Sequence, residues 1–294
     1  MTKTTKGIIY LIFSAFCFSL MAVFVHFAGS INFMQKAFFR NTSALIIALS
    51  LLLKDICKSG TKSIIVPKES IKYLLLRSIA GSIGVFGNFY AIDHLILSDA
   101  SILNKMSPFF AVIFSAILLK EKIKPIPLLA IIVAFCGSML IIKPSFNFSQ
   151  SLPSICGFLG GVGAGFAYTC VRKLSTQNCN GKVIVLIFSL FSSVLSLPFL
   201  IFFFEPMTFN QTMFLILSGV AAASGQFGIT LAYYNAPAKE ISIYDYSTII
   251  FSSIFGFVFF NQMADLYSFL GYLIIISMAI LNFIYNARRH NSER

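Results

Sequence analysis

Apolar residues occupy this 294-residue chain in ten long blocks that alternate with short polar segments. A block of about 18–20 apolar residues is long enough to cross the hydrocarbon core of a bilayer as a helix. The first block is too long for a signal-peptide core and has no small-residue cleavage pattern, so it is predicted to stay as a span. The pattern therefore predicts an all-α membrane protein with ten transmembrane helices. The predicted spans cover about residues 7–27, 36–53, 73–92, 98–119, 126–142, 152–171, 183–204, 211–233, 241–260 and 267–286.

The last five spans repeat the first five. Residues 104–108 (Asn-Lys-Met-Ser-Pro) align with residues 244–248 (Tyr-Asp-Tyr-Ser-Thr), which places one charge over another. Because five is an odd number, the two copies enter the membrane from opposite sides, and the solute site of such a protein lies near the midplane between the copies. The chain is therefore predicted to form two inverted five-helix repeats, residues 1–146 and 147–294.

Composition agrees with a membrane protein and also gives its orientation. Only 11% of the residues are charged, against about 25% in a typical soluble domain, and the mean hydropathy is +0.87. The net charge of +12 comes from Lys and Arg clusters between spans. A cytoplasmic N-terminus would put 18 of the 22 basic residues, Arg77 included, in cytoplasmic segments. We therefore expect a protein of the cytoplasmic (inner) membrane with both termini cytoplasmic. The clusters form no basic face with interleaved aromatic residues, which disfavours a nucleic-acid partner.

Lys105 and Asp245 are charged residues at equivalent places inside predicted spans, where a cation costs about 2.5–3.5 kcal/mol on insertion scales. Lys105 is one to two turns from the outer end of its span. It either anchors an anionic group of the solute or extends its ammonium group to the outer interface. Asp245 is four residues into its span from the cytoplasmic side. It would bind a cationic group, carry a proton, pair with Lys105 or Arg40, or serve as an interfacial carboxylate. Since the two charges start from opposite faces, a direct pair needs tilted helices or a shared cavity, and none is assumed.

Further side chains are candidates for the solute path or its movement. Arg40 is either a structural residue at the outer face or a gate that clamps a solute carboxylate. Pro108 is expected to loosen its helix and free backbone carbonyls. Gly161 and Gly165 serve close helix packing or let helices slide. Polar side chains at membrane depth either line the path or bond neighbouring helices. Those assigned to substrate binding beside Lys105 and Asp245 are Asn88, Tyr90, Asn104, Tyr168, Gln226 and Tyr244.

The remaining polar residues assemble no catalytic constellation. The sequence contains no paired carboxylates, Ser–His–Asp set or metal-ligand cluster, and its six cysteines form no CxxC pair. The glycine-rich stretch 157–165 is not followed by Gly-Lys-Ser/Thr, which excludes a phosphate-binding P-loop. The sequence therefore predicts no enzyme, no cofactor and no metal.

The first copy contains four short motifs, 38–40 (Phe-Phe-Arg), 88–92 (Asn-Phe-Tyr-Ala-Ile) continuing through 98–101 (Ser-Asp-Ala-Ser), 107–108 (Ser-Pro) and 118–122 (Leu-Leu-Lys-Glu-Lys). These motifs resemble those of the EamA-type transporters in the drug/metabolite transporter superfamily, and the resemblance covers almost the whole chain. Lys120 replaces the family's glycine; in the second copy, Asn261 stands where the family usually has a glutamate, and Thr248 stands where a proline is common. The resemblance implies ten helices in two inverted copies and transport of small metabolites without ATP hydrolysis.

The expected function is secondary transport of a small polar or zwitterionic metabolite, amino-acid-like or nucleoside-like, by alternating access. This expectation rests on one cation, one anion and many aromatic side chains at membrane depth. The alternative from a different class is a membrane scaffold or accessory subunit whose polar residues only join helices. Proton coupling is one of the roles open to Asp245, and the sequence is compatible with a monomer or a homodimer.

Overall fold

The computed structural model describes residues 2–29, 31–59, 66–95, 97–122, 124–143, 151–261 and 263–292, and these residues form helices joined by short connections. Within these described ranges, ten segments are long and apolar enough to cross a membrane, which confirms the ten predicted spans. The first half contains α1 (Lys3–Ala28), α2 (Phe33–Ser59), α3 (Lys68–His94), α4 (Leu97–Asn104), α5 (Ser107–Leu118) and α6 (Pro125–Ile142). The second half contains α7 (Ser151–Thr176), α8 (Gly181–Phe202), α9 (Phe209–Asn235), α10 (Ala238–Ile241), the 3₁₀ segment η2 (Ser242–Tyr246), α11 (Ser247–Phe260) and α12 (Leu266–Ser292).

The fourth and ninth spans are interrupted rather than continuous helices, and the break in the fourth lies beside Pro108, where the sequence predicted a loosened helix. The fourth span consists of α4 and α5, which are separated by a turn at Lys105 and Met106. The ninth span consists of α10, η2 and α11. Both interruptions fall on the stretches that align between the two halves. The predicted repeat boundary at residues 146 and 147 lies outside the described residues.

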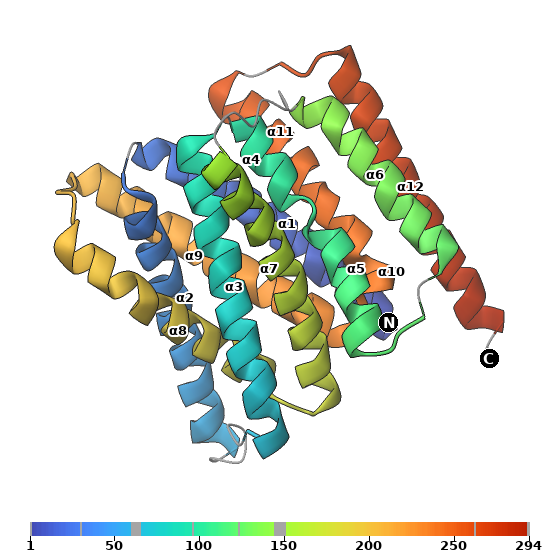
Figure 1. The fold of residues 1–294 in the computed structure, drawn as a ribbon, viewed down its shortest axis with the longest axis horizontal. Coiled ribbons are helices and arrows are strands. Elements are labelled where there is room, and N and C mark those ends of the chain that lie inside the picture. The colour runs from blue at the N-terminus through green and yellow to red at the C-terminus, as the bar shows by residue number, and fades with distance from the viewer. Residues whose placement is uncertain are drawn as a thin grey trace.

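Helices of one half pack mainly on helices of the other half. The most extensive contacts join α1 to α9 and α3 to α7, and these two pairs exchange when the halves are exchanged. The pairs α2–α8 and α6–α12 each join corresponding spans of the two halves, and α3 and α7 run side by side in Figure 1. The arrangement is consistent with two inverted five-helix repeats.

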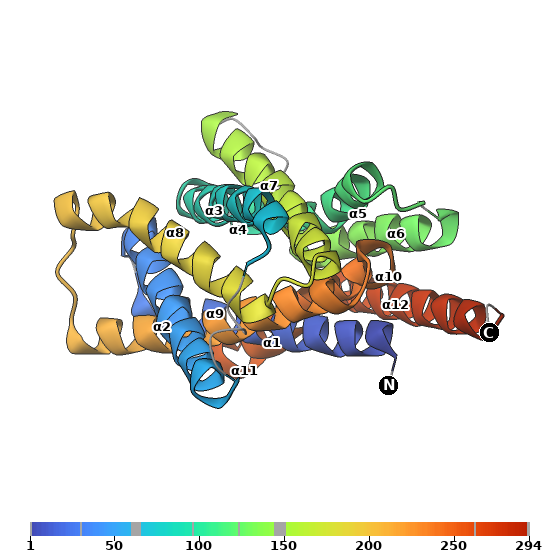
Figure 2. The same ribbon diagram turned by 90° about the horizontal axis from the view of Figure 1, so that it is seen from below.

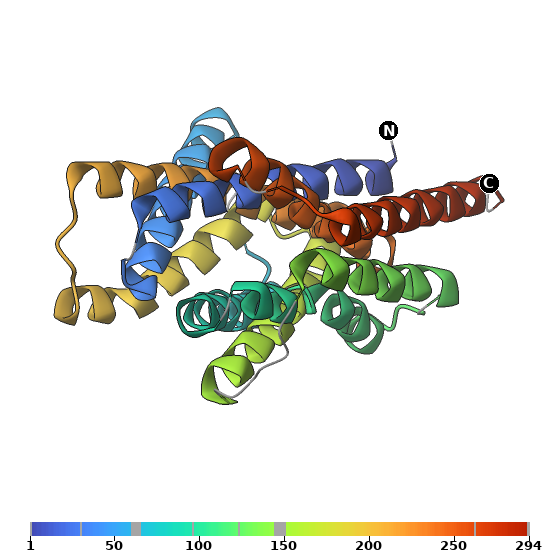
Figure 3. The same cartoon turned by 90° about the horizontal axis from the view of Figure 1, so that it is seen from above.

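The helices form two layers. Helices α3, α5, α6 and α7 lie in one layer, and α1, α9, α11 and α12 lie in the other (Figures 2 and 3). Large apolar side chains cover the outside of both layers; Ile117, Phe202 and Leu266 are 70%, 78% and 73% exposed. Such a continuous apolar exterior requires a lipid environment.

Glycines bring the backbones of α3 and α7 into contact. A Cβ on Gly163 would lie 2.6 Å from the Ala80 carbonyl oxygen, and one on Gly160 would lie 3.0 Å from the Asn88 amide nitrogen. Because these neighbours are backbone atoms, neither position accepts a side chain without moving a helix. The predicted small-residue contact along α7 is therefore present, and α3 is its partner.

The ends of α5 and α11 are also alike. Lys120, just after α5, and Asn261, just after α11, both adopt left-handed backbone conformations, with φ of +54° and +52°. Helices commonly end on such a residue, and glycine is the usual choice because it has no Cβ. Lys120 therefore occupies a position that suits the glycine of the family motif.

Candidate functional site

The two charges predicted inside the spans form a direct ion pair. Lys105 Nζ lies 3.2 Å from Asp245 Oδ2 and 3.3 Å from the Asp245 carbonyl oxygen. The two side chains are only 11% and 12% exposed. The helix interruptions bring together two residues that start from opposite faces of the membrane. Such a low exposure means that each charge depends on the other for its stability.

The interruption beside Lys105 follows from Pro108. This proline lies in the first turn of α5, where its missing N–H removes no helical hydrogen bond. The Phe109 amide donates to the Met106 carbonyl at 3.0 Å, which leaves the Lys105 carbonyl without a helical donor. The hydroxyl of Tyr246, a fully buried residue of η2, donates to that carbonyl at 3.2 Å. The other half of the protein therefore satisfies the carbonyl that the interruption leaves open.

The interruption beside Asp245 is built without a proline. Residues 242–246 form a 3₁₀ turn, and the hydroxyl of Thr248 donates to the Asp245 carbonyl at 2.7 Å. Thr248 aligns with Pro108, so the two halves break the same helix with different residues. The result is a centre in which the side chain and the carbonyl of Asp245 both face Lys105.

Helix α7 passes close to this centre because two of its residues lack side chains. A Cβ on Gly161 would lie 2.6 Å from the Leu103 carbonyl oxygen. A Cβ on Gly165 would lie 2.6 Å from Phe110 Cβ and 2.8 Å from the Ala111 nitrogen. Both glycines thus pack against the interrupted fourth span.

A second group of charges lies on α2 and α3. The sequence prediction assigned Arg77 to a cytoplasmic segment. It is instead the tenth residue of α3 and only 2% exposed, so that assignment was wrong. Arg77 therefore no longer counts among the basic residues that indicate the orientation of the chain. Its guanidinium carbon lies 4.0 Å from the centroid of the Phe188 ring, a cation–π contact. Its Nε and Nη1 have no hydrogen-bond partner.

Arg40 lies beside this group. It borders a void of about 150 Å³, closed to water-sized molecules, together with Asn41, Phe188 and Gln226. Arg40 Nη1 is 3.4 Å from Asn41 Oδ1, a long hydrogen bond, and Gln226 Nε2 donates to Thr230 Oγ1 at 3.2 Å. Phe188 belongs to both the Arg77 contact and the void, so it connects the two arginines.

Tyr168 is within electrostatic range of both charge groups. The charges of Asp245, Arg40 and Arg77 all act on it. Its ring stacks on Tyr233, with centroids 4.7 Å apart and planes 8° from parallel. Of the predicted site residues, the structure therefore gathers Lys105 and Asp245 in one centre and Arg40 and Gln226 in another, with Tyr168 close to both.

The remaining predicted site residues lie around these centres or away from them. The Tyr244 hydroxyl donates to the Ala279 carbonyl on α12 at 3.1 Å, so it is directed away from Lys105. Tyr90 stacks on His94 near the end of α3, with centroids 4.1 Å apart. Asn104 is the last residue of α4. Asn88 lies on α3, and its backbone nitrogen faces Gly160 of α7.

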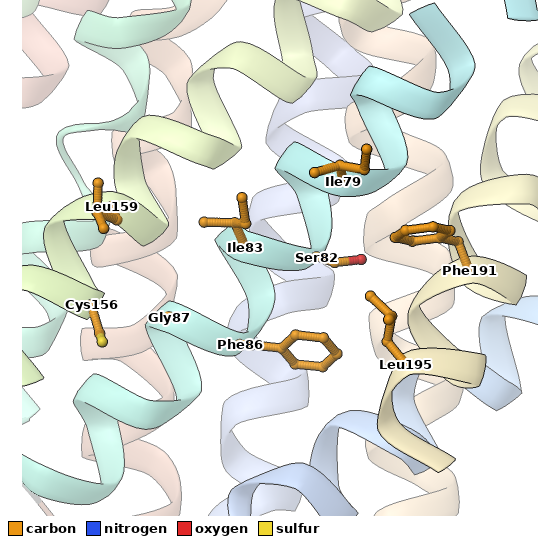
Figure 4. Close-up of a pocket in the computed structure, with 9 residues that line it drawn as sticks. All are labelled: Ile79, Ser82, Ile83, Phe86, Gly87, Cys156, Leu159, Phe191 and Leu195. Atoms are coloured by element: carbon orange, nitrogen blue, oxygen red, sulfur yellow. The ribbon is translucent and has the colours of Figure 1, made fainter. Parts of the chain in front are cut away.

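A groove on the described surface is a separate feature. It has a volume of about 330 Å³ and opens between α3, α7 and α8. Figure 4 shows its apolar lining, which includes Ile79, Ile83 and Leu195, each between 44% and 47% exposed. At its floor, Ser82 and Ser192 share a hydrogen bond of 2.5 Å. An apolar groove on the lipid-facing exterior does not suit a polar solute.

Two carboxyl groups outside the spans have shifted pKa values. Burial raises the pKa of Glu121, the glutamate after α5, and the nearby Lys239 and Arg172 oppose this shift. A hydrogen bond from Lys143, followed by bonds from Ser268, lowers the pKa of Asp265 to about 2.

The comparisons with known proteins agree with this architecture. The model of the EamA-like transporter family matches residues 5–143. The chain is 28% identical to the pseudopaline exporter CntI of Pseudomonas aeruginosa over 277 residues, which are 94% of this chain and 95% of the exporter. The chain is an EamA-type transporter of the drug/metabolite transporter superfamily. This EamA-type chain is also 28% identical to human solute carrier family 35 member G1, over 92% of its own length and 77% of the carrier.

The fold of the EamA-type chain has also been observed by crystallography. One solved crystal structure has a TM-score of 0.83 to this chain at 13% identity, covering 96% of this chain and 98% of the other. Because the family and its named relatives are transporters, this chain is a transporter and not an enzyme.

Sequence reasoning missed three contributors to these centres. Arg77 was grouped with the basic residues of the preceding segment, although it lay five residues inside the predicted third span. Asn41 and Phe188 gave no signal, because an asparagine beside an arginine and one phenylalanine among 34 are unremarkable in a membrane helix. The usable signal was Gly81, one helical turn beyond Arg77, since a small residue at that spacing leaves room for a long side chain.

Proposed function

We propose that this protein is a secondary transporter that moves a small polar or zwitterionic metabolite, amino-acid-like or nucleoside-like, across the cytoplasmic membrane. The observation that carries the proposal is the buried pair of Lys105 and Asp245 at two matching helix interruptions. A zwitterion offers a carboxylate to the lysine and an ammonium group to the aspartate. The solute carboxylate would take the place of Asp245 beside Lys105, and the solute ammonium would take the place of Lys105 beside Asp245. Both protein charges therefore stay compensated when the ion pair opens to bind the solute.

The same geometry supports alternating access as the mechanism. The interrupted helices supply short segments that can reorient, and the inverted arrangement lets one half rock against the other around the ion pair. The close backbone contacts of Gly161 and Gly165 with the fourth span are the surfaces at which such rocking would slide. The closed void beside Arg40 corresponds to a conformation without an open path.

Orientation and coupling complete the proposal. The Lys and Arg bias supports a cytoplasmic location for both termini even without Arg77. Asp245 is the proposed proton carrier, because separation from Lys105 would leave a carboxylate at membrane depth that is stabilised by taking up a proton. The ion pair is complete within one chain, so the mechanism works in a monomer as well as in a homodimer.

The test is a solute screen in proteoliposomes, with and without an imposed proton gradient. Wild-type protein is expected to move at least one amino-acid-like or nucleoside-like solute, and the gradient is expected to drive its accumulation. Vesicles that remain impermeable to every such solute, while the protein is folded and correctly inserted, contradict the proposal and favour the scaffold alternative.

A further inference from the structure

Arg77 points into the bilayer and not toward the nearer end of its helix. It lies nine residues after the start of α3, which is about 13 Å along the helix axis. Helical side chains normally lean toward the N-terminus, and an arginine at this depth would reach the interface in that direction. A Cβ added to Gly81, one turn toward the C-terminus, would instead collide with Arg77 Nη1. The guanidinium therefore lies over Gly81 and extends toward the middle of α3.

This guanidinium has no counter-charge. The four ion pairs between described residues involve neither Arg77 nor Arg40. The Phe188 ring faces the charge but accepts no conventional hydrogen bond, and Nε and Nη1 remain unpaired. An unpaired charge buried to this extent is rare because of its desolvation cost, and in a membrane helix it marks a ligand or ion path.

The groups beside Arg77 have the same deficiency. Arg40 forms only the long hydrogen bond to Asn41 Oδ1. Asn41 is 1% exposed, and its Nδ2 has no acceptor. Arg40 is close enough to Arg77 for the two charges to repel each other. All the unsatisfied atoms named here are donors, so the missing partner is a negatively charged acceptor.

We infer that Arg77 and Arg40 together hold an anionic group of the transported solute, a carboxylate or a phosphate; this inference rests on the proposed transport function. The planar guanidinium fork matches either group with two parallel hydrogen bonds. The void beside Arg40 admits no water-sized molecule in this conformation, so the anionic group enters only when the surrounding helices move apart. Tyr168 is within electrostatic range of both arginines and of Asp245, so the body of the solute is placed toward Lys105 and Asp245. The solute thus carries a negative charge beyond the zwitterion that the ion pair accommodates.

The inference is tested by thermal unfolding of the purified full-length protein in detergent, at constant pH and ionic strength. The probes are matched pairs: L-glutamate with L-glutamine, L-aspartate with L-asparagine, and glucose 6-phosphate with glucose. At least one anionic member is expected to raise Tm by several degrees more than its neutral partner. A preference confined to glutamate and aspartate identifies a carboxylate, and one confined to the sugar phosphate identifies a phosphate.

Three variants connect that preference to the arginines. Arg77→Gln is expected to abolish the difference between paired probes, and Gly81→Ala is expected to reduce it by displacing the guanidinium while keeping the charge. Arg288→Gln, which removes an exposed arginine, is the matched control and is expected to keep it. If Arg77→Gln does not fold, Gly81→Ala alone decides. Equal Tm shifts for all paired probes in wild type, or a difference that persists in Arg77→Gln, overturn the inference.

Flux measurements separate this inference from the proposed function. If wild type and Arg77→Gln move the anionic solutes at equal rates in proteoliposomes, the anion site is wrong while transport stands. If wild type moves no solute at all, the transport proposal itself fails.

Discussion

Lys105 with Asp245 and Arg40 with Arg77 place four charges inside the same bundle, but only the first two compensate each other. The ion pair is closed by a direct contact of 3.2 Å and by hydrogen bonds from the opposite half of the chain. The arginines come from neighbouring spans of one half, and their donors have no acid to meet. The ion pair is therefore satisfied without a solute, whereas the arginines keep unpaired donors that the proposed anion would complete. Removing a charge should therefore have opposite effects on stability in the two centres.

The largest expected effect comes from opening the ion pair. Lys105→Ala leaves the Asp245 carboxylate buried and unpaired, which typically costs about 3–5 kcal/mol. Thermal unfolding in detergent is expected to show a large fall in Tm. The double variant Lys105→Met with Asp245→Asn removes both charges and is expected to recover most of that loss. If the single variant is as stable as wild type, the pair is not a compensated unit.

The same assay applied to Arg77 sharpens the contrast. Arg77→Met keeps an unbranched apolar side chain against Phe188 but removes the uncompensated charge. The variant is expected to unfold at the wild-type Tm or above it in the absence of solute, because the desolvation cost of the charge disappears. A fall in Tm comparable to that of Lys105→Ala would mean that Arg77 is a structural residue.

A smaller loss is expected from crowding the contact between α7 and the fourth span. In Gly161→Ala, the new methyl meets the Leu103 carbonyl oxygen at 2.6 Å, and overpacking of this kind costs about 1–3 kcal/mol. Gly181→Ala is the matched control, since its nearest atom would be 3.8 Å away. Equal unfolding temperatures for the two variants would show that α7 does not press against the ion-pair centre.

Removing one hydrogen bond from the centre tests how much the second half supports Lys105. Tyr246→Phe deletes the donor to the Lys105 carbonyl, which is expected to cost about 0.5–1.5 kcal/mol. Tyr267→Phe, at a position that is 61% exposed, serves as the control and should be neutral. An unchanged Tm in Tyr246→Phe would mean that the Lys105 carbonyl does not depend on the Tyr246 hydroxyl.

The smallest effect concerns a surface ion pair, which gives the reference for charges outside the bundle. Lys143 Nζ lies 2.5 Å from Asp265 Oδ2, and this contact, together with bonds from Ser268, lowers the pKa of Asp265 to about 2. Since the folded pKa lies below the unfolded value near 4, this stabilisation is present above about pH 4 and is lost as the pH falls toward 2. Tm measured between pH 6 and pH 3 should fall slightly more steeply in wild type than in Asp265→Asn. Parallel curves would mean that the pair contributes nothing, as exposed pairs often do.

The sequence predicted the span count, the aligned charges and the residues of the ion pair, because apolar block length and intramembrane charge are strong local signals. It did not predict that Lys105 and Asp245 touch, because contact depends on how far each interrupted helix reaches, and Thr248 gave no sign of a break. Arg77 was misplaced because its charge resembled that of the preceding basic segment. Its true environment comes from α8, which supplies Phe188, and from the room above Gly81, and both depend on tertiary packing.

The central claim is that the ion pair of Lys105 and Asp245 is the solute-binding centre of a transporter. Its most direct test is solute flux into proteoliposomes containing equal amounts of wild type or of the Lys105→Met, Asp245→Asn double variant, whose charges are removed together so that the fold is preserved. The prediction is robust flux for wild type and none above empty vesicles for the folded double variant. Full flux through the double variant would contradict the account.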